Sequence, residues 1–214
     1  MLKIPLLSAL IENSDPAENC KRSFRNFHAV GLDYINLLFS RELTAKVYFI
    51  DRGRVTPTDD GFLVNPHDHS YDFDTTVVAG SIINRVFTED YAGSLHHRFN
   101  FRSPLRGGDG FQFVGPVGLL HDDARRYWRG DEYHMSHSAV HTLETCDEDA
   151  ILFLLQYRDE PKPFTRFYQR AATAPSLEGL YQPMDAAKYE RLLHRVRECL
   201  SPADRAIPEP QESK

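Results

Sequence analysis

Three histidines on extended segments constrain most strongly what this chain can fold into. His67 and His69 stand one residue apart after Gly61, and His141 ends a second stretch that begins at Gly130. Alternate side chains of a β-strand project to the same face, so the first pair can present two imidazoles to one ion. A third imidazole from another strand would complete the set and leave positions open for substrate or water. The sequence therefore predicts a metal site at His67, His69 and His141.

The spacing of these histidines resembles the two motifs of the cupin superfamily, G-x5-H-x-H-x3,4-E-x6-G and G-x5-P-x-G-x2-H-x3-N. The positions that match are Gly61, His67, His69, Gly80, Gly130 and His141. Ser136, Ser138 and Thr145 depart from the second motif, where the family has proline, glycine and asparagine. The resemblance implies an all-β cupin (jelly-roll) barrel with N-terminal helices and one C-terminal helix.

The acidic ligand of the first motif is less certain to be present. Asp74 stands in place of the family's glutamate, and the spacing to Gly80 is one residue shorter. A one-residue slip turns a strand side chain to the opposite face of its sheet. Either a local bulge makes Asp74 a fourth ligand, or Phe73 faces the site and the ion keeps three histidines. The sequence leaves both alternatives open.

The hydrophobic pattern divides a single expected cupin domain, residues 1–214, into successive regions. An N-terminal helical region, 1–44, is predicted from apolar residues at helical spacing, namely Leu6, Leu7, Leu10 and Ile11, then Leu32, Ile35, Leu38 and Phe39. A β-barrel core, 45–160, is predicted from short β-rich runs at 46–50, 62–64, 75–78, 81–87, 98–101, 111–114 and 151–157. A helix over 185–200, capped by Asp185, and a frayed tail over 201–214 complete the chain.

A long insert, Thr88 to Arg129, separates the two cupin motifs. It contains Arg106-Gly-Gly-Asp-Gly110 and Gly115-Pro-Val-Gly118. No Gly-Lys-Ser/Thr or helix start follows these glycines, so hairpin turns explain them better than a phosphate-binding loop. Such an insert could cover the mouth of the barrel.

Composition excludes several classes of function. The formal net charge is −6, with acidic and basic residues mixed throughout, which argues against nucleic-acid binding. No apolar run approaches the roughly 20 residues of a membrane helix. Cys20, Cys146 and Cys199 lack C-x-x-C spacing, which fits a reducing cytoplasm. We therefore expect a cytoplasmic protein without membrane or nucleic-acid partners; a homodimer is compatible with these features.

Within the cupins, the chain resembles the thiol dioxygenases, such as cysteine dioxygenase. Phe39-Ser-Arg41 precedes Pro66-His-Asp-His69 at a similar distance, and Tyr157 lies on the strand after His141. The resemblance implies that Arg41 clamps a substrate carboxylate and that Tyr157 assists the reacting oxygen. Phe153 and Leu155 replace the serine and histidine that support the family's tyrosine. The resemblance thus bears on the ligands more than on the substrate.

These features favour an iron(II)-dependent oxygenase that uses dioxygen and acts on a small polar, carboxylated molecule. Nickel, manganese and zinc also suit imidazole and carboxylate ligands. A cupin isomerase or lyase would instead use the metal as a Lewis acid, with His137 or Tyr133 moving protons. A non-catalytic cupin that binds a small ligand is the third alternative.

Overall fold

Antiparallel strands dominate the regular structure, and three α-helices accompany them in the part that the structure covers. A computed structural model describes residues 3–145 and 148–201. Its helices are α1 (Lys3–Glu12), α2 (Pro16–Cys20), the 3-10 helix η1 (Pro104–Arg106) and α3 (Ala186–Leu200). Its strands are β1 (Phe24–Arg25), β2 (Leu32–Phe39), β3 (Leu43–Ile50), β4 (Tyr71–Ala79), β5 (Ser81–Arg102), β6 (Gly110–Trp128), β7 (Glu132–Met135), β8 (Val140–Thr145), β9 (Ala150–Asp159), β10 (Thr165–Gln169) and β11 (Gln182–Pro183).

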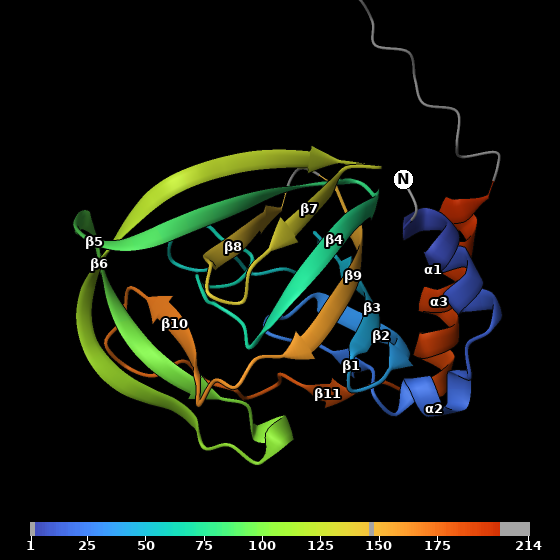
Figure 1. The fold of residues 1–214 in the computed structure, drawn as a ribbon, viewed down its shortest axis with the longest axis horizontal. Helices are drawn as coiled ribbons and strands as arrows, with labels where there is room; N and C mark the ends of the chain where they lie inside the picture. Colours follow the sequence, from blue (N-terminus) through green and yellow to red (C-terminus); the bar gives the residue numbers. More distant parts are fainter. Residues whose placement is uncertain (1–2, 146–147, 202–214) are drawn as a thin grey trace, which may run out of the picture.

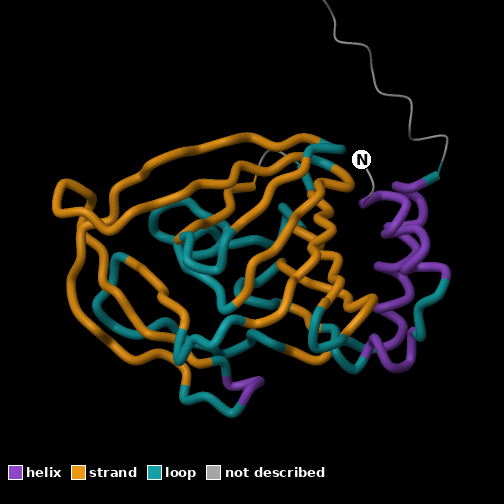
Figure 2. The backbone as a smooth tube through the Cα atoms, viewed as in Figure 1, coloured by secondary structure: helices purple, strands orange, loops and turns teal. Residues whose placement is uncertain are grey.

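Two antiparallel sheets face each other and form a barrel (Figure 1). One sheet has the order β11-β1-β2-β3-β9-β4-β7, and the other has β10-β5-β6, with β8 paired to β5. Helices α1 and α3 pack on the outer face of the first sheet, at the end opposite the curved β5–β6 hairpin (Figures 1 and 2). The predicted all-β barrel with N-terminal helices and a C-terminal helix is confirmed.

Alternation along β9 supplies two cores at once. Ile151, Phe153 and Leu155 pack with the helices on the outside of the sheet. Leu152 and Leu154 pack inside the barrel against residues of the opposite sheet. Burial of both faces explains why β9 reads as a continuous apolar run and not as an alternating one.

The same two-sided burial makes the predicted helix at Leu32–Phe39 wrong. This segment is strand β2, in which Ile35 and Leu37 face the helices while Leu32 and Tyr34 face the barrel interior. A strand that is apolar on both faces carries no period-2 signal, so the accidental helical spacing of its leucines misled the sequence analysis. Within residues 3–44, α1 and α2 are the only α-helices, while strands β10 and β11 continue the sheets beyond residue 160.

The long insert folds as one extended hairpin. The predicted strands 81–87 and 98–101 are two parts of β5, and the turn at Pro104–Arg106 leads into β6. Gly118 lies inside β6 and not in a turn. Glycine is needed there, because a Cβ would stand 2.0 Å from the carbonyl oxygen of Asp90, where β5 bulges. The predicted strand at 62–64 is a loop.

Helix α3 begins as predicted at Asp185, whose carboxylate accepts a hydrogen bond from the Lys188 amide. The predicted tail, apart from Ser201, and Cys146 lie outside the described residues. Within residues 3–145 and 148–201, no helix combines the length and the apolar character needed to cross a bilayer.

The packing of α3 on the sheet gives a test of the outer core. Leu193 is fully buried, whereas Glu190 on the same helix is exposed. Leu193→Ala should lower the free energy of unfolding by about 2–5 kcal/mol, because it removes buried methyl groups and leaves a cavity. Glu190→Ala should change it by less than about 0.5 kcal/mol. Urea unfolding measures both, and equal effects would contradict the assigned face of α3.

Candidate metal centre

Backbone pairing brings the two histidine motifs together. The amide of His67 donates to the carbonyl of His141 at 3.0 Å, and the amide of His141 donates back to His67 at 2.9 Å. On its other side, His67 pairs with Phe167 of β10. The extended segment around His67 therefore fills the space between β8 and β10, and its alternation places His67 and His69 on the same side.

The three imidazoles converge on one point. Ligand nitrogens of His67, His69 and His141 all lie within 4.8 Å of one another. The Nε2 atoms of His69 and His141 are 2.9 Å apart. Two nitrogen lone pairs at that distance repel, so the pair needs a proton or a cation between them. This geometry is what a shared ion requires, since two nitrogens at about 2.1 Å from one metal can stand about 3 Å apart.

Hydrogen bonds fix which nitrogen each ring presents. The Nδ1 of His141 donates to the Oδ1 of buried Asn84 at 2.7 Å, and the Nδ1 of His67 donates to the Asn65 carbonyl at 2.8 Å. Both rings are therefore held with Nε2 unprotonated and free to bind. Partners of this kind orient the ligands of many metal sites.

Burial keeps the three rings neutral. It lowers the pKa of His67, and it lowers the pKa of His69 and His141 well below the usual value, with the neighbouring histidines adding to the fall. Neutral imidazole is the form that binds a metal ion. The donor atoms, their spacing and their protonation therefore all fit a divalent transition metal at this position.

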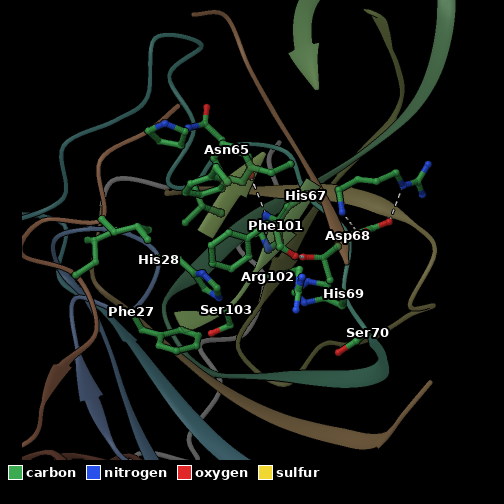
Figure 3. A pocket seen from close by; sticks show the side chains of 18 of the residues that line it. Phe27, His28, Asn65, His67, Asp68, His69, Ser70, Phe101, Arg102 and Ser103 are labelled. Atoms are coloured by element: carbon green, nitrogen blue, oxygen red, sulfur yellow. Dashed lines mark hydrogen bonds and ion pairs between the residues drawn. The ribbon is translucent and has the colours of Figure 1, made fainter. Parts of the chain in front are cut away.

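The histidines stand in a cavity of about 530 Å³. Figure 3 shows His28, Phe101 and Ser103 around the space beside His67 and His69. Further aromatic lining comes from Phe27, Tyr71, Phe111, Phe167 and Tyr181. Phe101 and Phe111 belong to the β5–β6 hairpin, so the insert does contribute a wall of the cavity, as expected from its position between the motifs.

Asp74 lies on the other face of β4, away from the histidines. Its carboxylate accepts hydrogen bonds from Tyr157 at 2.5 Å and His134 at 2.8 Å, and it pairs with Lys3 at 3.2 Å. The Phe73 ring faces the site instead, 4.9 Å from the ring of His69. The alternative in which Asp74 is a fourth ligand is therefore wrong. The cause is the one-residue register slip in the first motif, which turns Phe73 and not Asp74 toward the site.

Two residues singled out by the thiol dioxygenase resemblance also lie elsewhere. Tyr157 follows Ile151, Phe153 and Leu155 on the outer face of β9, where its hydroxyl contacts Asp74. Arg41 lies in the turn between β2 and β3, with its side chain 79% exposed. Neither lines the cavity of the histidines. Their proposed roles as catalytic tyrosine and carboxylate clamp are therefore corrected.

His137 and Asp68 support the site from outside the cavity or from its edge. The Nδ1 of His137 lies 2.9 Å from the Asp72 carboxylate, and the His137 carbonyl accepts from the His69 amide at 3.2 Å. Asp68 points away from the histidines, as expected, and its buried carboxylate accepts from Lys162 and Arg166. This ion pair ties the histidine segment to β10. The proton-transfer role considered for His137 finds no support in its place, because it does not line the cavity.

Several residues of the cavity were missed by the sequence analysis. His28 is half-buried with its ring 5.5 Å from that of His67, and its φ of +67° places it in a turn that a helical reading of 1–44 hides. Lys46 is buried inside the barrel on β3, and Tyr71 has its ring 5.1 Å from that of His69. The alternation of β3 and β4 could have identified Lys46 and Tyr71 once the strand registers were known.

Comparisons with known proteins find similarity only among solved structures. No protein-family model matches the chain, and no curated protein matches its sequence. Similar solved structures include the DMSP lyase DddQ from Ruegeria pomeroyi DSS-3, with a TM-score of 0.36, 15% identity, 61% of this chain and 49% of that chain covered. KdgF from Halomonas sp. has a TM-score of 0.35 and 19% sequence identity, with 60% of this chain and 82% of KdgF covered. An RmlC-like cupin from Shewanella frigidimarina NCIMB 400 has a TM-score of 0.36 and 15% sequence identity, with 70% of this chain and 88% of that chain covered.

The match thus spans about half the length of the DMSP lyase.

Ligand substitutions test the assignment of the metal centre. His67→Ala, His69→Ala and His141→Ala should each nearly abolish binding of a divalent metal, because each removes one of three converging nitrogens. Asn84→Ala should weaken binding about 10- to 100-fold, because it frees the ring of His141 to turn. Competition titration with a chromogenic chelator measures these affinities.

Asp74→Asn is the matched control. It changes a carboxylate close to the site in sequence that lies on the other face of β4, so metal affinity should stay near that of the wild-type protein. A loss as large as that of His67→Ala would show that Asp74 is a ligand after all.

Proposed function

We propose that this protein is a metal-dependent enzyme of the cupin type that holds one divalent ion at His67, His69 and His141. The observation that carries the proposal is the convergence of three neutral imidazoles, that of His141 buried and the other two half-buried, on one point in a cavity of about 530 Å³. A cavity of this volume suits a small molecule. A purely structural ion would need no such space beside it, since structural sites are closed by protein ligands.

We propose further that the reaction is an iron(II)-dependent oxygenation of a small polar substrate. Such an ion would supply electrons for the activation of dioxygen, as well as Lewis acidity, when bound at the three histidines. The proposal is supported by three neutral nitrogen ligands and by a cavity beside them whose lining combines aromatic rings with polar side chains. Imidazole ligands suit nickel, manganese and zinc too, so metal analysis is part of the test.

Residues of the chain itself would orient the substrate. Burial raises the pKa of Tyr71, so its hydroxyl stays protonated and can donate a hydrogen bond to a substrate oxygen. The ring of Phe73 packs against those of His69 and His141, which restricts both ligands and keeps water from that side. Tyr71 therefore takes the place in the scheme that Tyr157 had in the sequence analysis.

A Lewis-acid isomerase or lyase is the second candidate, and the position of His28 favours it. Its imidazole lines the cavity beside His67, and burial lowers its pKa well below the usual value. A neutral imidazole next to the metal centre can accept a proton from a substrate carbon or oxygen. Such a reaction would need no dioxygen.

Oxygen dependence separates the two reactions. The iron-loaded protein should consume dioxygen only when its substrate is present, in a screen of small carboxylated molecules that includes thiols, followed with an oxygen electrode. The His141→Ala variant serves as the control for free iron. Turnover at the aerobic rate under strict anaerobiosis would overturn the oxygenase and favour the Lewis-acid reaction.

A pair of tyrosine variants tests which hydroxyl serves the reaction. Tyr71→Phe should lower kcat about 10-fold or more, because it removes a donor that lies beside the metal centre. Tyr157→Phe should leave kcat within about twofold, because its hydroxyl contacts Asp74 outside the cavity. Steady-state kinetics of the two variants decide, and the reverse order of effects would restore the role first expected for Tyr157.

A further inference from the structure

A buried lysine inside the barrel has no acidic partner. Lys46 extends from β3, is only 9% exposed, and donates one hydrogen bond, at 2.8 Å, to the Oε1 of Gln156. Among residues 3–145 and 148–201, no carboxylate lies within ion-pair distance of its ammonium group. A buried cation without a counter-charge costs several kcal/mol. A bound anion would offset the cost of burying this ammonium group.

Aromatic rings surround Lys46 and stabilise its positive charge only in part. Its ammonium lies 5.1 Å from the ring of Tyr34, 5.8 Å from that of Tyr71 and 5.9 Å from that of Phe27, so aromatic faces fill much of its environment. Burial lowers its pKa to about 8; the positive charge of Arg106 adds to the fall, and the negative charge of Asp159, which is paired with Arg106, opposes it. The group is therefore still mostly charged at neutral pH, and it retains protons that Gln156 does not use.

Lys46 also lies where two cavities meet. It lines the cavity of the histidines and a second cavity of about 720 Å³. The lining of the second cavity is strongly basic. Its cationic residues are Lys21, Arg22, Arg41, Lys46, Arg106 and Arg158, and its one acidic residue is Asp159. In a chain whose formal net charge is −6, this concentration of positive charge marks an approach for anions.

We propose that Lys46 binds the anionic group of the substrate, a carboxylate, at the junction of the two cavities, while the body of the substrate lies among the aromatic walls beside the three histidines. This inference rests on the proposed function for the reacting end of the molecule. The basic second cavity attracts the anion by its field, and Lys46 makes the specific contact. Arg106 and Asp159 form an ion pair at 2.7 Å. Both side chains line both cavities, so this pair lies at the junction together with Lys46.

The role of carboxylate binding assigned to Arg41 from sequence thereby passes to Lys46. Arg41 reaches only the second cavity, and its side chain is mostly in solvent, so its charge acts through a screened field. Lys46 is buried and Arg41 is exposed, and replacing either one by a neutral residue removes one positive charge. They form a matched pair for the test.

The experiment measures binding of benzoate and of its neutral analogue benzamide by NMR titration of the purified protein. Wild-type protein should bind benzoate and discriminate against benzamide. Lys46→Met, which keeps the length of the side chain without its charge, should weaken benzoate binding about 10- to 100-fold and leave benzamide unchanged. Arg41→Gln should weaken benzoate less than about threefold at physiological salt. Equal small effects of the two variants would overturn the proposal.

Two further arms keep the result decisive. Lys46→Met should melt no lower than the wild-type protein, because it removes an uncompensated buried charge; a folded variant that binds benzoate normally contradicts the proposal. Binding that depends on Lys46 should survive treatment with a chelator. Binding lost on chelation would place the carboxylate on the metal, which overturns the role of Lys46 and leaves the metal centre intact.

The pH dependence supplies an independent signature. The groups that face the ammonium include Tyr34, Tyr71, Gln156, Arg106 and Asp159. His28 and His69 also interact with its charge, and burial lowers the pKa of both imidazoles well below the usual value, so neither gains or loses a proton near pH 8. Burial raises the pKa of both tyrosines, so neither loses its proton near pH 8. Benzoate binding should therefore weaken as pH rises through and above about 8, and Lys46→Arg, which stays charged, should remove this dependence. The same pH profile in wild type and Lys46→Arg would exclude Lys46 as the titrating contact.

Discussion

The reciprocal pairing of His67 and His141 is the interaction on which the site depends. Two backbone hydrogen bonds, at 3.0 and 2.9 Å, join segments that are far apart in the chain. They set the register of the first histidine motif against β8, so every side chain of that motif takes its direction from them. The ion pairs of Asp68 with Lys162 and Arg166 hold the same segment against β10 from the other side. A short extended segment held along both edges can present two imidazoles with little freedom.

The barrel interior carries polar groups that the fold by itself does not require. Neutral histidines and a lysine without a counter-ion replace the apolar residues that would pack best there. The rest of the interior compensates with a continuous apolar core between the sheets and a second core beneath α1 and α3. The outer core lies between the first sheet and the helices, whereas the cavity lies inside the barrel. The free-energy cost of the polar site and this source of stability are therefore in different layers. Such separation lets the interior serve binding without loss of the barrel.

Much of the architecture could be predicted from sequence, because it depends on local patterns. The glycines of the two motifs, Gly61, Gly80 and Gly130, all have positive φ, which explains why the family pattern keeps glycine in its turns. Asp185 marks the start of α3 by a capping interaction that involves only its neighbours. The spacing of His67 and His69 needs only the alternation of extended backbone. Each of these signals is independent of the tertiary structure.

The missed features all depend on register or on burial of both faces. Strand β2 was mistaken for a helix because its two faces pack against different cores. Asp74 and Phe73 exchanged roles through a one-residue slip, and Tyr157 fell on the outer face of β9 by the same rule of alternation. His28 and Lys46 entered the site from segments that carry no motif. Whether a lysine points into a barrel or out of it is decided by strand pairing, which a single sequence does not display.

X-ray absorption spectroscopy of the metal-loaded protein tests the central claim most directly. The account predicts first-shell nitrogen or oxygen ligands at about 2.0–2.2 Å, with the outer-shell scattering of three imidazoles. The His67→Ala variant, treated with metal under the same conditions, should retain almost none of it and give no imidazole scattering from three ligands. A spectrum of the wild-type protein without imidazole scattering, or one that His67→Ala leaves unchanged, would contradict the three-histidine centre.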